Sequence, residues 1–140
     1  MRIVIDASVA IKWVMRDALL ESDADKALAM LRGIRAHTIE VFEPPHWVAE
    51  ILAVIARARP QRIALTLGIL STLAFKENVR QSCYRRAALI AIQYNHHLFD
   101  TLYHAVALEE GATLVTADEA YFAKATGLGN IQRLADFVAP

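Results

Sequence analysis

The sequence predicts an α/β fold, a three-layer α/β/α sandwich with a central, mostly parallel sheet. Short apolar runs that suit buried strands alternate with longer segments whose apolar residues recur every three or four positions, the spacing of a helix. Strands separated by helices favour a parallel sheet with helices on both faces. The 140 residues fit one domain, 1–140, and an apolar content of 56% supplies a sizeable core.

The first part of the chain contains two of the predicted strands. Arg2–Ile5 is an apolar run that ends at Asp6, as a buried parallel strand does. Ser8–Met15 and Asp23–Ile34 have the spacing of helices, and Ile39–Phe42 predicts the second strand.

Proline sets the boundaries of the next helix. Pro44 and Pro45 stop the strand and open a helix over His46–Ala58, which Pro60 ends, and the apolar-rich Gln61–Phe75 is the following helix. The remaining elements are expected in the order Asn78–Ser82 (short strand or loop), Tyr84–Tyr94 (helix), Asp100–Glu110 (helix), Ala112–Val115 (strand), Asp118–Ala125 (helix) and Ile131–Leu134 (short strand).

Composition excludes several classes of protein. Fifteen basic and fifteen acidic residues balance, which excludes an overall basic nucleic-acid binder and a disordered acidic chain. A single cysteine, Cys83, excludes an internal disulfide and favours a reducing compartment. The longest uncharged stretches, Ile63–Phe75 and Ala87–Phe99, fall short of the roughly 20 residues that span a bilayer. We therefore expect a cytoplasmic protein without a membrane segment, whose excess of apolar residues indicates a homodimer or higher homo-oligomer.

Four acidic residues stand in apolar surroundings. Asp6, Asp100 and Asp118 lie at strand-to-helix junctions, and Glu50 lies on a helix that is apolar on almost every side. Junctions that follow parallel strands share one edge of the sheet, so these carboxylates are expected to converge. Converging carboxylates repel one another unless a hard cation joins them, and Mg²⁺ or Mn²⁺ suits such a site.

Structural explanations stay open for each acid. Asp6 and Asp100 could be helix N-caps, and Glu50 could form an ion pair with Arg57. Thr116 and Glu119 match a capping box, which would leave Asp118 without a structural task.

Four segments, taken in order, resemble the PIN domains and within them the VapC-type toxin ribonucleases. The segments are IVIDAS at Ile3–Ser8, the acid Glu50 after Pro44-Pro45, DTLYHAVA at Asp100–Ala107 and LVTAD at Leu114–Asp118. The resemblance implies a Mg²⁺- or Mn²⁺-dependent endoribonuclease that is paired with an antitoxin protein. It implies catalytic roles for Asp6, Glu50, Asp100 and Asp118, metal binding by Asp6, Asp100 and Asp118, and supporting hydroxyls at Ser8 and Thr116.

The chain departs from the family pattern at two places. Ala53 stands where members often carry Asn, and Ala120 and Tyr121 stand where many carry a further Asp or Asn. These departures keep an alternative open, a non-catalytic PIN-like module that binds RNA or a partner. A phosphotransfer enzyme with an aspartyl nucleophile is disfavoured, because Asp6-Ala7-Ser8 lacks a second Asp.

Basic residues gather in the middle of the chain. Between Ile51 and Phe99 seven bases face a single acid, Glu77. Such a segment beside an acidic metal site would attract an RNA backbone. A solvated basic face or a contact with an acidic partner explains the same charges equally well. The candidate RNA-binding residues are Arg57, Arg59, Arg62, Arg85 and Arg86.

Overall fold

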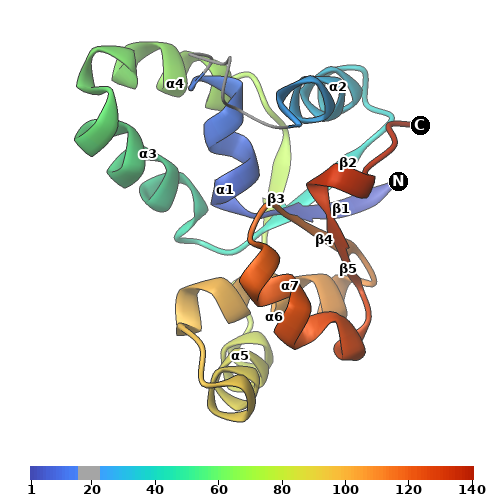
Figure 1. Ribbon diagram of the computed structural model, residues 1–140. Coiled ribbons are helices and arrows are strands. Elements are labelled where there is room, and N and C mark those ends of the chain that lie inside the picture. The colour runs from blue at the N-terminus through green and yellow to red at the C-terminus, as the bar shows by residue number, and fades with distance from the viewer. Residues whose placement is uncertain (16–22) are drawn as a thin grey trace.

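A parallel five-stranded sheet forms the centre of the molecule in residues 1–15 and 23–140, which the computed structural model describes (Figure 1). The strand order is β3-β2-β1-β4-β5, with β1 in the middle. Ile3 of β1 pairs with Val41 of β2 on one side and with Thr113 of β4 on the other. The strands are β1 (Arg2–Ile5), β2 (Glu40–Glu43), β3 (Phe75–Glu77), β4 (Thr113–Thr116) and β5 (Ile131–Arg133).

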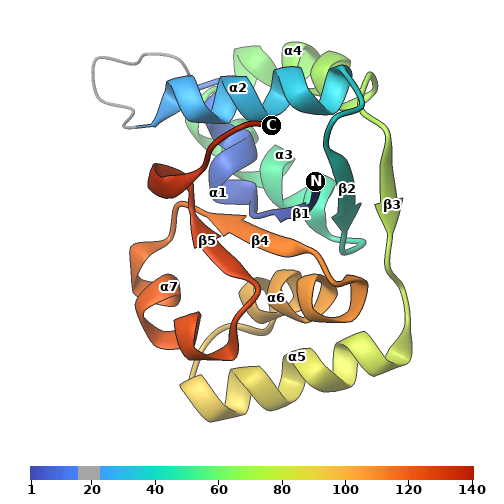
Figure 2. The same ribbon diagram turned by 90° about the vertical axis from the view of Figure 1, so that its right-hand side faces the viewer.

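Helices cover both faces of this sheet, which confirms the predicted three-layer α/β/α sandwich (Figure 2). One layer holds α1 (Ala7–Ala10), α2 (Ala24–Arg35), α3 (Trp47–Ala58) and α4 (Ile63–Leu70). The other layer holds α5 (Gln81–Tyr94), α6 (Leu98–Glu110) and α7 (Glu119–Ala125). Short 3₁₀ turns are η1 (Ile11–Trp13), η2 (Pro60–Arg62), η3 (Thr126–Leu128) and η4 (Leu134–Asp136). In the described residues, no helix is both long and apolar enough to cross a membrane.

The core lies on both faces of the sheet. In β1 and β4, Val4, Ile5 and Val115 are completely buried. On one face, Trp13 packs edge-on against Trp47, with ring centroids 6.4 Å apart. On the other, the residues of α6 from 101 to 107 are all buried between the sheet and α5. The first turn of α6, which carries Asp100, is thereby fixed against the sheet.

The predicted helix Gln61–Phe75 is too long. In the structure α4 ends at Leu70, because the Ser71 and Thr72 hydroxyls donate to the carbonyls of Gly68 and Ile69 and close the last turn. The chain then enters the edge strand β3 at Phe75, so the short strand precedes the expected segment Asn78–Ser82.

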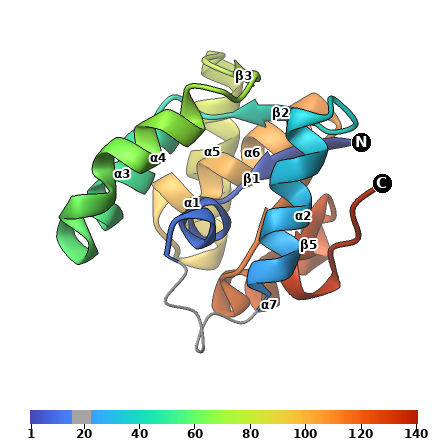
Figure 3. The same cartoon turned by 90° about the horizontal axis from the view of Figure 1, so that it is seen from above.

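Helix α3 is less buried than its apolar sequence indicates. Only Trp47, Ile51 and Ile55 are buried, and they form one stripe. Figure 3 shows α3 and α4 side by side at one side of the molecule, so much of their apolar surface remains exposed. Val54, Leu65 and Leu67 are between 38% and 55% exposed.

Candidate active site

Asp6 and Asp118 are joined by one threonine at the carboxyl ends of β1 and β4. The Thr116 hydroxyl donates to Asp6 Oδ2 at 2.5 Å and accepts from the Asp118 backbone N–H at 3.0 Å. On the other side, Asp6 Oδ1 accepts from the Ser8 backbone N–H at 3.1 Å and thus caps α1. The alternative that Asp6 is an N-cap is confirmed, and the same carboxylate also faces the site. The same alternative is wrong for Asp100, because α6 begins at Leu98 and its N-cap is His97.

Ser8 and Asp118 hold the loop that follows β4. The Ser8 hydroxyl accepts from the Ala117 N–H at 3.2 Å, and Asp118 Oδ1 accepts from the Tyr121 N–H at 2.9 Å. Asp118 is therefore the N-cap of α7, and the predicted capping box of Thr116 and Glu119 is wrong. The box fails because the Thr116 hydroxyl is already engaged by Asp6 and by the Asp118 N–H.

Asp100 links the four predicted acids electrostatically. Burial raises the pKa of Asp100, and the negative charges of Glu50 and Asp118 raise it further, while His96 opposes them. Burial also raises the pKa of Asp6 from 3.8 to about 6, and the charge of Asp100 adds to that increase. The acids thus form one cluster, although they come from four distant segments.

Glu50 faces the same cluster from α3. The Tyr103 hydroxyl donates to Glu50 Oε2 at 2.5 Å, and His46 Nε2 lies 3.4 Å from the same oxygen. Burial raises the pKa of Glu50, but these two partners outweigh it, so the pKa is lowered and Glu50 is ionised at neutral pH. The contacts that the structure gives Glu50 thus come from His46 and Tyr103 and not from Arg57.

Glu43 is a fifth acid beside the site that sequence reasoning missed. Its side chain at the end of β2 is completely buried, and Oε1 accepts from the Ile5 N–H at 2.8 Å. Oε2 has no hydrogen-bond partner among the described residues. Burial raises the pKa of Glu43 well above its usual range, and the charge of Asp6 raises it further. Its position at the carboxyl end of a strand resembles that of Asp6 and is a signal that the sequence offers.

Histidines are the second group that the sequence did not reveal. His96 lies in the connection between α5 and α6, and its Nε2 is 3.0 Å from Asp100 Oδ2. Atoms of His96, Asp100 and Asp118 that can bind a metal all lie within 4.8 Å of one another. Carboxylate oxygens beside an imidazole nitrogen can bind a divalent cation, so the residues present fit a divalent metal ion such as the expected Mn²⁺.

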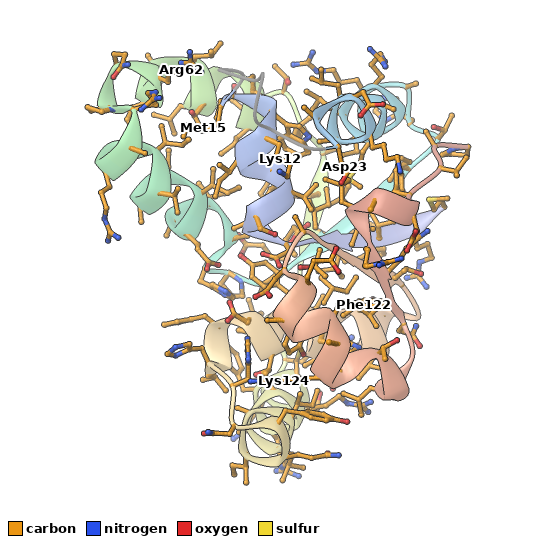
Figure 4. All side chains as sticks on the ribbon, in the orientation of Figure 1. Lys12, Met15, Asp23, Arg62, Phe122 and Lys124 are labelled. Carbon is orange, nitrogen blue, oxygen red and sulfur yellow. The ribbon has the colours of Figure 1, made fainter. Side chains whose placement is uncertain are left out.

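His104 and the candidate RNA-binding arginines lie apart from this cluster. His104 is completely buried, where its Nε2 bonds the Gly129 carbonyl at 2.7 Å. Arg62 donates to the Val14 carbonyl, and Figure 4 shows it near Met15 in the layer of α1–α4. Arg57 lies in the last turn of α3, and Arg59 is the C-cap of that helix. Arg85 and Arg86 are exposed on α5 near Glu109, at the end of α6 away from Asp100.

The fold and the site define a parallel α/β protein whose carboxylates meet at the carboxyl edge of the sheet. A family model described as PIN domain matches residues 3–128. The chain therefore belongs to the PIN-domain family. A comparison with curated proteins found no significant match.

Solved structures share the fold at low sequence identity. VapBC2 from Rickettsia felis, bound to a DNA fragment from its promoter, superposes with a TM-score of 0.68 at 15% identity, over 95% of this chain and 98% of the other. A toxin-antitoxin complex from Klebsiella pneumoniae superposes with a TM-score of 0.67 at 17% identity, over 96% of this chain and 98% of the other. PAE2754 from Pyrobaculum aerophilum superposes with a TM-score of 0.62 at 17% identity, over 96% of this chain and 90% of the other.

Proposed function

We propose that this protein is a metal-dependent endoribonuclease, and that it is the toxin of a type II toxin–antitoxin pair of the VapC type. One observation carries the proposal: in a PIN-domain chain, Asp6, Glu50, Asp100 and Asp118 meet in one electrostatic cluster. The similarity to toxin-antitoxin complexes supports the biological role.

In the proposed mechanism Asp6, Asp100 and Asp118 would hold Mg²⁺ or Mn²⁺. The bound ion would lower the pKa of a water molecule and offset negative charge on the phosphate. Thr116 fixes Asp6 and Asp118 relative to each other, and the Ser8 hydroxyl holds the loop that follows β4.

Glu50 orients the attacking water in this proposal. Its carboxylate is held by the Tyr103 hydroxyl, and its lowered pKa suits a hydrogen-bond acceptor better than a base. Hydrolysis breaks the bond between phosphorus and the 3′ oxygen, which leaves a 3′-hydroxyl and a 5′-phosphate.

Arginines on both helical layers would bind the RNA backbone at a distance from the cut. Arg57, Arg59 and Arg62 lie at the junction of α3 and α4, and Arg85 and Arg86 lie on α5. In this proposal the two groups would contact phosphates on either side of the site.

An apolar cavity beside the acids supports binding of an antitoxin protein. His46, Ala49, Glu50 and Phe99 line a cavity of about 220 Å³, and Phe99 is 61% exposed. An apolar helix of the antitoxin would cover Phe99, and a basic side chain from it would reach the carboxylates. The exposed apolar residues of α3 and α4 support a homodimer.

The alternative is a non-catalytic module of the same fold that binds RNA or a protein partner. Ala53 is exposed and offers no ligand atom, and the buried Tyr121 hydroxyl contacts His104 Nδ1 at 3.0 Å. The two positions at which many family members carry a further polar or acidic residue therefore add nothing to the metal site here.

A cleavage assay separates the two functions. Structured RNAs are incubated with the protein in Mn²⁺ or in EDTA, and 5′ ends of the products are mapped. We expect cleavage in Mn²⁺ alone, and its loss in Asp6→Asn and Asp100→Asn, with the exposed Asp25→Asn as the matched control. Cleavage by both site variants, or none by the wild-type protein, would contradict the nuclease.

A further inference from the structure

His96 is held at the acidic cluster by local backbone geometry and packing. Asn95 adopts a left-handed conformation, with φ of 47°, and ends α5, so that the chain turns back toward α6. The His96 ring packs against Tyr121 with centroids 4.7 Å apart. Its side chain is 12% exposed, whereas the next residue, His97, is exposed. The ring therefore has a fixed position that does not depend on Asp100.

The inner nitrogen of this ring lacks a proper hydrogen bond. Nε2 is inaccessible to solvent and has no hydrogen-bond partner among the described residues. Asp100 Oδ2 is 3.0 Å away, but it lies off the direction in which an N–H on Nε2 would point. A buried polar atom of this kind is costly unless something else satisfies it.

The spacing of the atoms fits coordination of one ion. Ligands that occupy neighbouring corners of an octahedron, each about 2.1 Å from the metal, are about 3.0 Å apart. Nε2 of His96 and Oδ2 of Asp100 have this separation. Asp118 supplies a third ligand atom within 4.8 Å of both, and its Oδ2 is not needed for capping α7.

We propose that His96 Nε2 is itself a metal ligand, together with Asp100 and Asp118, and that the site prefers a divalent transition-metal ion to Mg²⁺. The inference rests on the metal site of the proposed function and deepens it. Imidazole nitrogen is a poor partner for Mg²⁺, which is bound by oxygen, whereas transition-metal ions accept mixed nitrogen and oxygen ligands. An all-carboxylate site would not discriminate in this way.

Lys124 lies beside the other ring nitrogen of His96 and has to move when Nε2 binds a metal. Its Nζ on α7 lies 3.4 Å from Nδ1 of His96. When Nε2 binds a metal, Nδ1 carries the ring proton, so the ammonium cannot donate to it. Lys124 is exposed and can turn into solvent. Lys124→Met should therefore leave metal binding intact or strengthen it.

Metal binding by the full chain, without RNA, tests the proposal. Mn²⁺ affinity is measured from the EPR signal of the free ion, and Mg²⁺ affinity by competition. His96→Gln places an oxygen near the same position and should lower Mn²⁺ affinity by about tenfold or more, with little change for Mg²⁺. His97→Gln is the matched control and should change neither. Pulsed EPR should detect a nitrogen coupled to Mn²⁺ in the wild-type protein and in His97→Gln only.

The outcomes of these measurements test the inference about His96 separately from the proposed nuclease function. If His96→Gln lowers both affinities equally, or if the nitrogen coupling persists in it, His96 only orients Asp100 and the inference is wrong. A wild-type protein that binds neither ion would refute both the inference and the metal site of the proposed nuclease. Nitrogen-coupled Mn²⁺ in a protein that cleaves no RNA would refute the nuclease and leave this inference standing.

Discussion

Asp6→Asn should stabilise the metal-free protein at neutral pH, unlike most substitutions of buried residues. Burial raises the pKa of Asp6 from 3.8 to about 6. The unfolded chain therefore loses its proton at lower pH than the folded chain, and folding becomes less favourable as the pH rises through this window. The difference in pKa between the folded and the unfolded chain lowers the free energy of unfolding by about 3 kcal/mol at pH 7.5 and by about 1 kcal/mol at pH 4.5.

Asparagine keeps the other interactions of Asp6. It caps a helix about as well as aspartate does, so the bond from the Ser8 N–H survives. The Thr116 hydroxyl can rotate to accept from the new amide. At pH 7.5 the free energy of unfolding of Asp6→Asn should exceed that of the wild type by nearly ~3 kcal/mol, which corresponds to a rise in Tm of roughly 10 °C.

The assay is a set of melting curves in EDTA at pH 4.5 and 7.5 for the wild type, Asp6→Asn and the exposed control Asp25→Asn. Mn²⁺ at a hundred times its Kd should stabilise the wild type by ~2.7 kcal/mol and the Asn variant much less. A variant that is less stable than the wild type at pH 7.5, or a gain that does not depend on pH, would refute the reasoning.

Two further perturbations test the neighbours of Asp6. Glu43→Gln keeps the acceptor for the Ile5 N–H but cannot ionise, and the pKa of Glu43 is raised well above 4.5. The wild type should lose stability in urea titrations as the pH rises above 4.5, and the variant should lose less, whereas equal pH slopes would contradict the raised pKa. Thr116→Val leaves the Asp118 N–H unpaired and should cost about 1–3 kcal/mol in the same titrations, and Thr116→Ser should restore most of it. A fully stable Val variant would show that this hydroxyl does not hold the site.

The sheet and most helices follow from patterns that are local in sequence. Arg2–Ile5 is recognised by its apolar run, and Pro44 and Pro45 mark where β2 gives way to α3. The end of α4 could not be predicted, because it depends on hydroxyl groups that close a turn at Ser71 and Thr72. The helical spacing of the apolar residues does not indicate where this helix ends.

The site was predicted by residue type and position, but its contacts were not. Strand ends share an edge, so Asp6 and Asp118 could be placed together from the sequence. Glu43 could not be singled out from the sequence, because its burial comes from the packing around β1 and β2. The approach of His96 to Asp100 depends on the turn at Asn95, which the spacing of residues along the chain does not indicate.

The hydrogen bond from Thr116 to Asp6 joins residues that are 110 positions apart. Synthesis proceeds from the N-terminus, so Asp6 leaves the ribosome early and its partners Thr116 and Asp118 leave near the end. A nascent or truncated chain that stops before β4 can fold local helices but cannot assemble the acidic cluster. The acidic cluster therefore forms late in translation, and the activity proposed for it would begin only after β4 has paired with β1.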